Sequence, residues 1–161
     1  MINEDTTVIK ASNVLVLTTW HPNIFETNKC VFTKNILVNQ VLHGKYSYQL
    51  ISPIPYFPNI KLSFIQKKKK KYSLIDEYED GGLYQIYRPK YVKLPYPLSR
   101  HIDWYTYYKA VQSCIKSYNL NYDIIHSHGL FPDAYVAAKL SQYYNIPLIV
   151  HVHDCYFTEL Y

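Results

Sequence analysis

Residues 122–134 read YDIIHSHGLFPDA, and this stretch decides the fold class. A short β-rich run leads directly into histidines, a glycine and a proline, as at the end of a buried strand. We expect a strand over 122–126, and then a helix from Asp133, as its N-cap, to Tyr144. The run PLIVHV at 147–152 predicts the next strand. A strand, a helix and a strand in this order indicate a parallel sheet.

The same alternation extends toward the N-terminus. The expected strands cover 14–17, 48–52 and 83–87, and the expected helices cover 33–43 and 103–119. Asp103 is the expected N-cap of the second of these helices. Residues 54–82 predict an irregular insertion, with a short hairpin around 61–65, because prolines, lysines and glycines interrupt the pattern. The whole pattern predicts an α/β fold, a Rossmann-like open parallel sheet with helices on both faces.

Length and composition indicate one globular domain. The 161 residues suffice for a single core, and 48% apolar against 18% charged residues exclude a disordered chain. We expect a polar lead over residues 1–12 and the domain over 13–161. The lead lacks the basic and apolar regions of a signal peptide, and no apolar run approaches the roughly 20 residues that span a bilayer. The three cysteines form no CxxC pair, so we expect a cytoplasmic protein.

The net charge of +5 is concentrated in Lys67–Lys71. A solvated loop is the simplest interpretation of such a run. The alternative is contact with anionic phospholipid headgroups, which would place the protein peripherally at the inner face of the membrane. Nucleic acid is not an expected partner, because no RNP pattern, zinc-finger spacing or basic helix accompanies the lysines.

Polar clusters follow three of the predicted strands. They are Thr19-Trp20-His21-Pro22-Asn23, His126-Ser127-His128-Gly129 and His151-Val152-His153-Asp154. In an open parallel sheet, ligands bind outside the carboxyl ends of the strands. We therefore expect the three clusters to converge on one crevice, with functional histidines at the strand tips, namely His128 and His153.

The two HxH pairs leave other interpretations open. Residues i and i+2 of a strand face the same side, so each pair could bind zinc or another divalent metal, as in metal-dependent hydrolases. Only Asp133 and Asp154 are placed to complete such a site, and we expect no metal. In the other interpretation, His126 and His151 are packed under the sheet and satisfied by backbone groups.

The stretch at 122–134 resembles the D-I-I-H-x-H-G-x-x-P-D-x run of the family 4 retaining glycosyltransferases. The resemblance continues in register through Ala137-Ala138-Lys139-Leu140 and Ile146-Pro147-Leu148-Ile149-Val150 to His153-Asp154. About 35 consecutive residues in register are much more specific than a lone motif.

The opening of the domain is also similar to that family. Trp20-His21-Pro22 stands where the family has a Y-P turn, and Asn28-Lys29-Cys30-Val31-Phe32 stands where it has a glycine-containing loop before the first helix. Lys29 or Cys30 replaces the glycine that lets backbone amides approach the donor phosphates. A side chain at this position would obstruct that approach.

The resemblance implies the N-terminal half of a GT-B fold, truncated, which binds the acceptor while a C-terminal half binds a nucleotide sugar. It implies sugar transfer with retention to an acceptor glycan or lipid-linked glycan, without a cofactor and without a metal. His153 matches the active-site histidine, and Asp154 follows it as an orienting carboxylate. The implied cleft residues are His21, Pro22, Asn23, His128, Gly129 and Asp133, and the implied phosphate-loop residues are Lys29 and Cys30.

The phosphate-stabilising arginine and lysine of the family, and its E-x7-E carboxylates, belong to the C-terminal half. We therefore expect this chain to be catalytically inactive by itself and active only with a second polypeptide that supplies the donor half. The alternatives are a non-catalytic binding or interaction module that kept the sheet, and a metal-dependent hydrolase that uses the HxH pairs.

Overall fold

The computed structural model describes residues 13–57, 71–94 and 99–153. The polar lead, the hairpin expected around 61–65 and Asp154 lie outside these residues. The strands are β1 (Asn13–Leu17), β2 (Ser47–Ile51), β3 (Ile54–Tyr56), β4 (Tyr78–Asp80), β5 (Gln85–Tyr87), β6 (Lys90–Val92), β7 (Ile124–His128) and β8 (Leu148–His151). The helices are α1 (Val31–His43), α3 (Ser99–Ser117) and α4 (Tyr135–Tyr144), with a π-helical turn, η1 (Leu130–Ala134), before α4.

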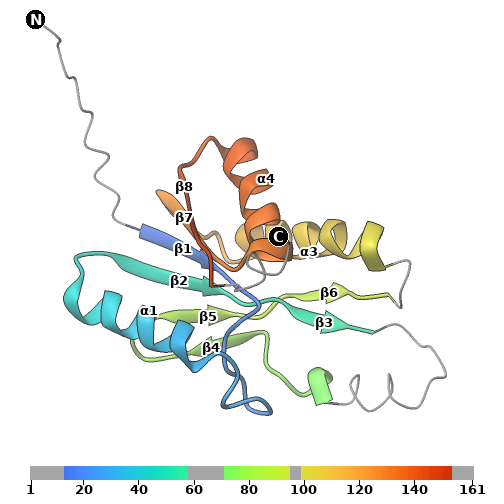
Figure 1. Cartoon of the computed structure of the whole chain (residues 1–161), viewed down its shortest axis with the longest axis horizontal. Coiled ribbons are helices and arrows are strands. Elements are labelled where there is room, and N and C mark those ends of the chain that lie inside the picture. Colours follow the sequence, from blue (N-terminus) through green and yellow to red (C-terminus); the bar gives the residue numbers. More distant parts are fainter. Residues whose placement is uncertain (1–12, 58–70, 95–98, 154–161) are drawn as a thin grey trace, which may run out of the picture.

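The main sheet has six strands in the order β4-β5-β2-β1-β7-β8, and all but β4 are parallel (Figure 1). The central strand is β1, in which Leu15 pairs with Gln49 of β2 and with Ile125 of β7. The chain first adds strands on the β2 side of β1 and then crosses to the β7 side. The carboxyl ends of β1 and β7 therefore border the crevice in which open α/β sheets bind ligands.

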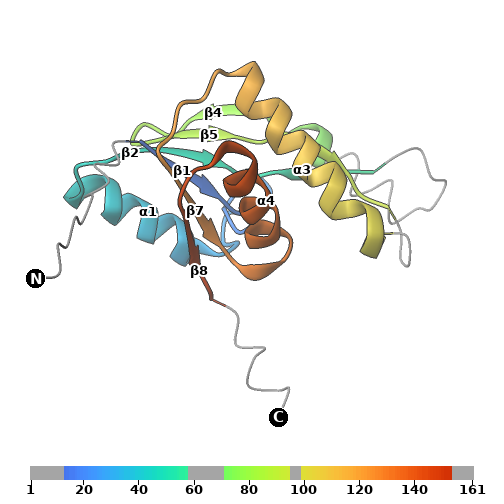
Figure 2. The same ribbon diagram turned by 90° about the horizontal axis from the view of Figure 1, so that it is seen from above.

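Alternate residues of the sheet are buried against helices on opposite faces (Figure 2). Val14 and Val16 of β1 cluster with Leu37 of α1, whereas Leu15 and Leu17 cluster with residues of α3 and α4. The two sets follow from the two-residue period of a strand. The predicted Rossmann-like sheet with helices on both faces is confirmed. None of the helices in the described ranges is long and apolar enough to cross a bilayer.

A second, two-stranded sheet corrects the prediction of an irregular insertion at 54–82. Strands β3 and β6 continue past the ends of β2 and β5 and pair in parallel, with Pro55 opposite Tyr91 (Figure 1). Proline cannot donate to a ladder, but it is tolerated in a pair where each strand has a free edge. Strand β4 also lies in this stretch and pairs antiparallel with β5.

Two predicted boundaries are wrong. Helix α3 begins at Ser99, before the predicted N-cap Asp103, whose carboxylate instead accepts a hydrogen bond from the N–H of Leu94 (3.2 Å). Strand β7 covers Ile124–His128 rather than 122–126. Pairing with β1 continues as far as Ser127 and pairing with β8 as far as His128, so the first HxH pair lies inside the strand.

The last strand is less buried than its apolar sequence suggests. Ile149 and Val150 of β8 are 50% and 40% exposed. Within the described part of the chain, β8 pairs only with β7 and forms an edge of the sheet. These two side chains are therefore not part of the core, although the run is apolar.

Candidate functional site

A buried carboxylate joins the loop after β1 to the segment after β7. Asp133 is 1% exposed, and it accepts hydrogen bonds from the N–H of Thr19 (3.0 Å), the hydroxyl of Thr19 (2.9 Å) and the hydroxyl of Tyr107 on α3. Asp133 was predicted to cap the helix that follows, but α4 begins at Tyr135 without a side-chain cap. The carboxylate is turned away from the helix end and holds β1, α3 and η1 together.

Burial sets the protonation of this carboxylate. The loss of water raises the pKa of Asp133 to about 6, although hydrogen bonds from Tyr107 and Thr19 lower it. Burial, together with the nearby Asp133 charge, raises the pKa of Tyr107. Tyr107 therefore remains a proton donor to Asp133 throughout the physiological range.

Four histidines of β7 and β8 are stacked on one another. His126 and His128 face the same side of β7, with ring centroids 4.3 Å apart. His151 of β8 pairs with His128 in the parallel register, with ring centroids 5.2 Å apart. His153 follows β8, and its Nε2 lies 2.8 Å from Nδ1 of His128, at hydrogen-bond distance.

Burial keeps the inner rings of this stack neutral. The loss of water, followed by the neighbouring histidines, lowers the pKa of His126 to about 4 and that of His128 to about 3. A neutral imidazole has one nitrogen lone pair available to a proton, a hydrogen-bond donor or a metal. His126 is buried, as the packing interpretation expected, whereas His151 is exposed.

Aromatic rings connect the first loop with the histidines. Phe32, in the first turn of α1, lies 4.7 Å from the ring of His153 and 6.3 Å from that of Trp20, edge to face in both contacts. Gly129 follows β7 with φ of 91° and ψ of 163°, a backbone conformation that only glycine adopts readily. A Cβ there would be 3.6 Å from Asp133 Oδ2, so the requirement for glycine is conformational rather than steric.

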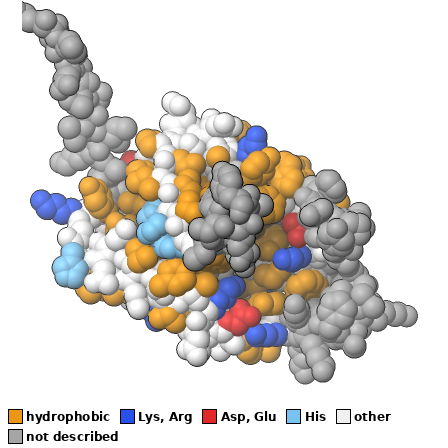
Figure 3. Space-filling view, viewed as in Figure 1, with side chains coloured by type: hydrophobic (Ala, Val, Ile, Leu, Met, Phe, Trp, Pro, Cys, Tyr) orange, Lys and Arg blue, Asp and Glu red, His pale blue; other side chains and the backbone are white. Residues whose placement is uncertain are grey.

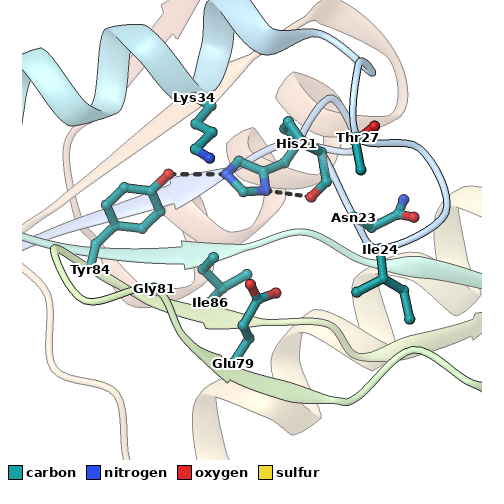
Figure 4. Close-up of a pocket in the computed structure, with 10 residues that line it drawn as sticks. His21, Asn23, Ile24, Thr27, Lys34, Glu79, Gly81, Tyr84 and Ile86 are labelled. Atoms are coloured by element: carbon teal, nitrogen blue, oxygen red, sulfur yellow. Dashed lines mark hydrogen bonds between the residues drawn. The ribbon is translucent and has the colours of Figure 1, made fainter.

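His21 lines a separate cavity of about 260 Å³ (Figure 4). Its Nδ1 lies 2.9 Å from the carbonyl oxygen of Pro22, and its Nε2 lies 3.0 Å from the hydroxyl of Tyr84. Because the carbonyl can only accept, Nδ1 carries the proton and Nε2 accepts from the tyrosine. Burial, followed by the Arg88 charge, lowers the pKa of His21 to about 4, so the ring is neutral.

Three charged residues in or beside this cavity were absent from the predicted site. The side chain of Arg88 is 3% exposed, donates to the carbonyl oxygen of Pro22 (2.9 Å) and forms an ion pair with Glu79 (3.0 Å). Glu79 and Lys34 also line the cavity, which therefore presents both charges to a ligand (Figure 4). Arg88 directly follows β5, and a polar residue at the carboxyl end of a strand was the signal that could have found it.

The loop between β1 and α1 contains three further predicted residues. Asn23 lines the cavity, but its Oδ1 accepts from the N–H groups of Phe25 and Glu26 and so fixes the shape of the loop. Lys29 lies 3.7 Å from the carboxylate of Glu26. Cys30 is the N-cap of α1 and adopts the left-handed conformation, with φ of 47° and ψ of 48°. Of the two residues, only Cys30 has the left-handed backbone that glycine favours, and the replacement of a family glycine in this loop stays a prediction.

One end of the lysine run reaches the same loop. Lys67–Lys70 lie outside the described residues, but Lys71 forms an ion pair with Glu26 (3.1 Å) and lies 5.9 Å from the ring centroid of Phe25. Lys71 is therefore bound to the protein rather than freely solvated. Membrane contact through the rest of the run stays a prediction.

Large apolar side chains are exposed near the polar groups. Figure 3 shows hydrophobic side chains spread over one face of the molecule, with histidines among them. Phe131 of η1 is 63% exposed, Val152 after β8 is 43% exposed and Phe32 is 41% exposed. Exposed apolar side chains beside polar groups are typical of an interaction surface.

The predicted single crevice therefore has two parts. Asp133, Gly129, His128 and His153 belong to one connected set of contacts. The set also includes Thr19 and Trp20 of the first predicted cluster, and Phe32 and Tyr107, which were not among the predicted site residues. His21, Pro22 and Asn23 line the separate cavity. Asp154 lies outside the described residues.

Residues 71–161, more than half of the chain, match the family described as Glycosyltransferase Family 4. The chain belongs to Glycosyltransferase Family 4. The resemblance found in the sequence is thereby confirmed, and the match includes α3, β7, β8 and the histidine stack. Membership implies a nucleotide-sugar donor and an acceptor as substrates. A comparison with curated proteins finds no significant match.

A stability prediction follows from the left-handed backbone at Cys30. Cys30→Gly should raise the free energy of unfolding by up to about 1 kcal/mol, because left-handed backbone costs about 1–2 kcal/mol in a residue with a Cβ and glycine returns part of that in chain entropy. Lys29→Gly is the matched control, since Lys29 has no positive φ, and it should lose about 0.5–1 kcal/mol. Urea denaturation measures both variants, and a less stable Cys30→Gly protein would contradict the assignment.

A second stability prediction concerns the hydrogen bonds to Asp133. Asp133→Ala should lower the free energy of unfolding by about 2–5 kcal/mol, because it leaves the buried donors of Thr19 and Tyr107 without an acceptor. Asp103→Ala removes a carboxylate with a single backbone donor and should cost only about 1 kcal/mol. Equal losses in denaturation experiments would show that Asp133 does not have the structural role described.

Because three histidines are held neutral in the folded state, we expect the protein to lose stability in acid. The folded state holds His21, His126 and His128 with pKa values of about 4, 4 and 3, below the unfolded value of 6.5. The unfolded chain therefore binds more protons, and stability should be complete above pH 6.5 and fall as the pH decreases toward 4. Because the pKa of Asp133 is raised in the folded state, this one group changes the free energy of unfolding with pH in the opposite direction, but three histidines act against it.

Denaturation at a series of pH values, with a chelator present, measures this loss. His126→Gln should flatten the dependence of the unfolding free energy on pH, because it removes a group that binds a proton only in the unfolded chain. A His126→Gln protein with the full wild-type slope would contradict a neutral, buried His126.

Proposed function

We propose that this Glycosyltransferase Family 4 chain is the acceptor-side part of a retaining glycosyltransferase. It would transfer a sugar from a nucleotide sugar to an acceptor glycan or lipid-linked glycan, together with a donor-binding domain outside these residues. The observation that carries the proposal is the contact between His128 and His153 at the carboxyl ends of β7 and β8, 2.8 Å between ring nitrogens. These ends lie beside β1, where open α/β sheets bind ligands.

The roles of the histidines follow from their surroundings. His153 is the outer member of the pair, and Phe32 holds its ring from the α1 side. The ring of His153, held by His128 and Phe32, would bind a sugar hydroxyl and position the anomeric carbon in an oxocarbenium-like transition state. Asp154 would orient His153 as the following carboxylate. The positive charge for the departing phosphate would come from the donor-binding domain.

The cavity at His21 fits the acceptor in this proposal. Lys34 and Glu79 offer a donor and an acceptor of hydrogen bonds, and the apolar side chains of Ile24 and Ile86 line the same space. A sugar presents hydroxyl groups, which both donate and accept hydrogen bonds, together with apolar C–H faces. A rigid wall supports the cavity, because the ion pair of Arg88 and Glu79 connects β5 to β4.

A non-catalytic binding module is the second candidate, and Cys30 is the observation that favours it. Its side chain stands at the position where a glycine would let backbone amides approach the donor phosphates. The left-handed backbone at Cys30 is nevertheless the one that a glycine would adopt, so the loop keeps the shape that the function requires.

Reconstitution of transfer tests the proposal. The full chain is assayed with a mixed panel of UDP- and GDP-sugars, with and without the product of the adjacent reading frame. We expect transfer only with both polypeptides, and we expect His153→Ala to abolish it by at least about 100-fold through lost positioning. His43→Ala, on the exposed side of α1, should keep full activity.

Unchanged turnover in the His153→Ala protein would contradict the site. Nucleotide-sugar binding without transfer, in every combination, would favour the non-catalytic module instead. A Cys30→Gly protein separates the two further, because donor affinity should rise only if backbone amides at α1 bind the phosphates.

A further inference from the structure

The histidine stack contains an arrangement that sugar transfer does not require. His126, His128 and His151 each offer one ring nitrogen, and these three atoms lie within 4.8 Å of one another. The first two residues are buried and the third is exposed. Three imidazoles on adjacent parallel strands are thus gathered from both HxH pairs of the sequence.

A buried atom without a partner points to a ligand. His128 is 0% exposed, and its Nε2 has no hydrogen-bonding partner among the described residues. Its other nitrogen, Nδ1, is engaged with Nε2 of His153 at 2.8 Å. Leaving such a buried polar atom unsatisfied is costly, and a bound cation would remove that cost.

The contact with His153 allows the tautomer that a metal needs. If Nδ1 of His128 donates its proton to Nε2 of His153, the buried Nε2 of His128 keeps a free lone pair. Metal-bound histidines commonly donate their other ring N–H to a neighbouring acceptor, which fixes both tautomer and ring orientation.

The spacing is close to that of a metal site. A point equidistant from three atoms spaced 4.8 Å apart lies about 2.8 Å from each, whereas zinc binds imidazole nitrogen at about 2.0–2.1 Å. Each ring would have to move inward by about 0.7 Å. Of the three ligands only His151 is exposed.

We propose that His126, His128 and His151 bind one zinc-class divalent cation, with the Nδ1–H of His128 donated to His153. The donor set consists of imidazoles without a carboxylate, and imidazole favours zinc, copper, nickel and cobalt over magnesium and calcium. The proposal replaces the expectation from the sequence that no metal binds, because the sequence did not show that three of the histidines come together.

Calorimetric titration of the full, chelator-treated chain with zinc chloride tests the site. We expect one zinc ion per chain and no competition from excess magnesium. His151→Gln should weaken zinc binding by more than about tenfold, and because His151 is exposed the fold should survive. His43→Gln, on α1, is the matched control and should bind as the wild type does.

Cobalt gives a second measurement that depends on no variant. Cobalt bound to three imidazoles in the wild-type chain should show the visible absorption of a nitrogen-ligated, near-tetrahedral ion, and zinc should displace it. His126→Gln should abolish this absorption, with circular dichroism confirming that the variant is folded. Absence of saturable zinc binding, or equal affinity in the wild type and His151→Gln, would overturn the proposal.

Discussion

The hydrogen bonds to Asp133 are the constraint on which the rest of the site depends. The residue follows β7, yet its carboxylate accepts both donors of Thr19 after β1 and the hydroxyl of Tyr107 on α3. Three segments far apart in the sequence therefore meet at the carboxylate of Asp133, a residue that is 1% exposed. Because an unpaired buried carboxylate would be costly, the loop after β1 and the turn after β7 are held in a fixed relation. Gly129 lies between β7 and this contact, where only a flexible residue permits the change of direction.

This constraint separates two environments that the sequence suggested as one. On the β7 and β8 side, Trp20 and Phe32 approach the histidine stack through edge-to-face ring contacts. On the β2 and β5 side, His21 is fixed between Pro22 and Tyr84. Both environments hold neutral imidazoles through burial rather than through a neighbouring carboxylate. A sugar transferase of this kind relies on positioning, for which rigid neutral donors and acceptors suffice.

The elements that could be predicted are those whose periodicity is local. The apolar run of β1, the stripe of α1 and the order of strands and helices all follow from repeats of two or three to four residues. Some of the predictions that failed concerned polar residues whose partners lie in other segments. Asp133 and Asp103 both resemble N-caps, but their carboxylates accept from other segments, and no local pattern reveals that a donor to Asp133 lies 114 residues away. In the same way, register places His151 against His128, whereas the sequence shows only two separate pairs.

The family match covers residues 71–161, whereas the loop after β1 and the start of α1 are argued from geometry. The central claim is that the strand ends of β1, β7 and β8 meet in one site, and ring-proton NOEs in the full chain with labelled histidine and phenylalanine test it most directly. The account predicts NOEs that link Phe32 to His153 and His153 to His128, whose ring centroids are 4.7 Å and 5.1 Å apart. A spectrum in which His153 shows NOEs to neither ring would contradict it.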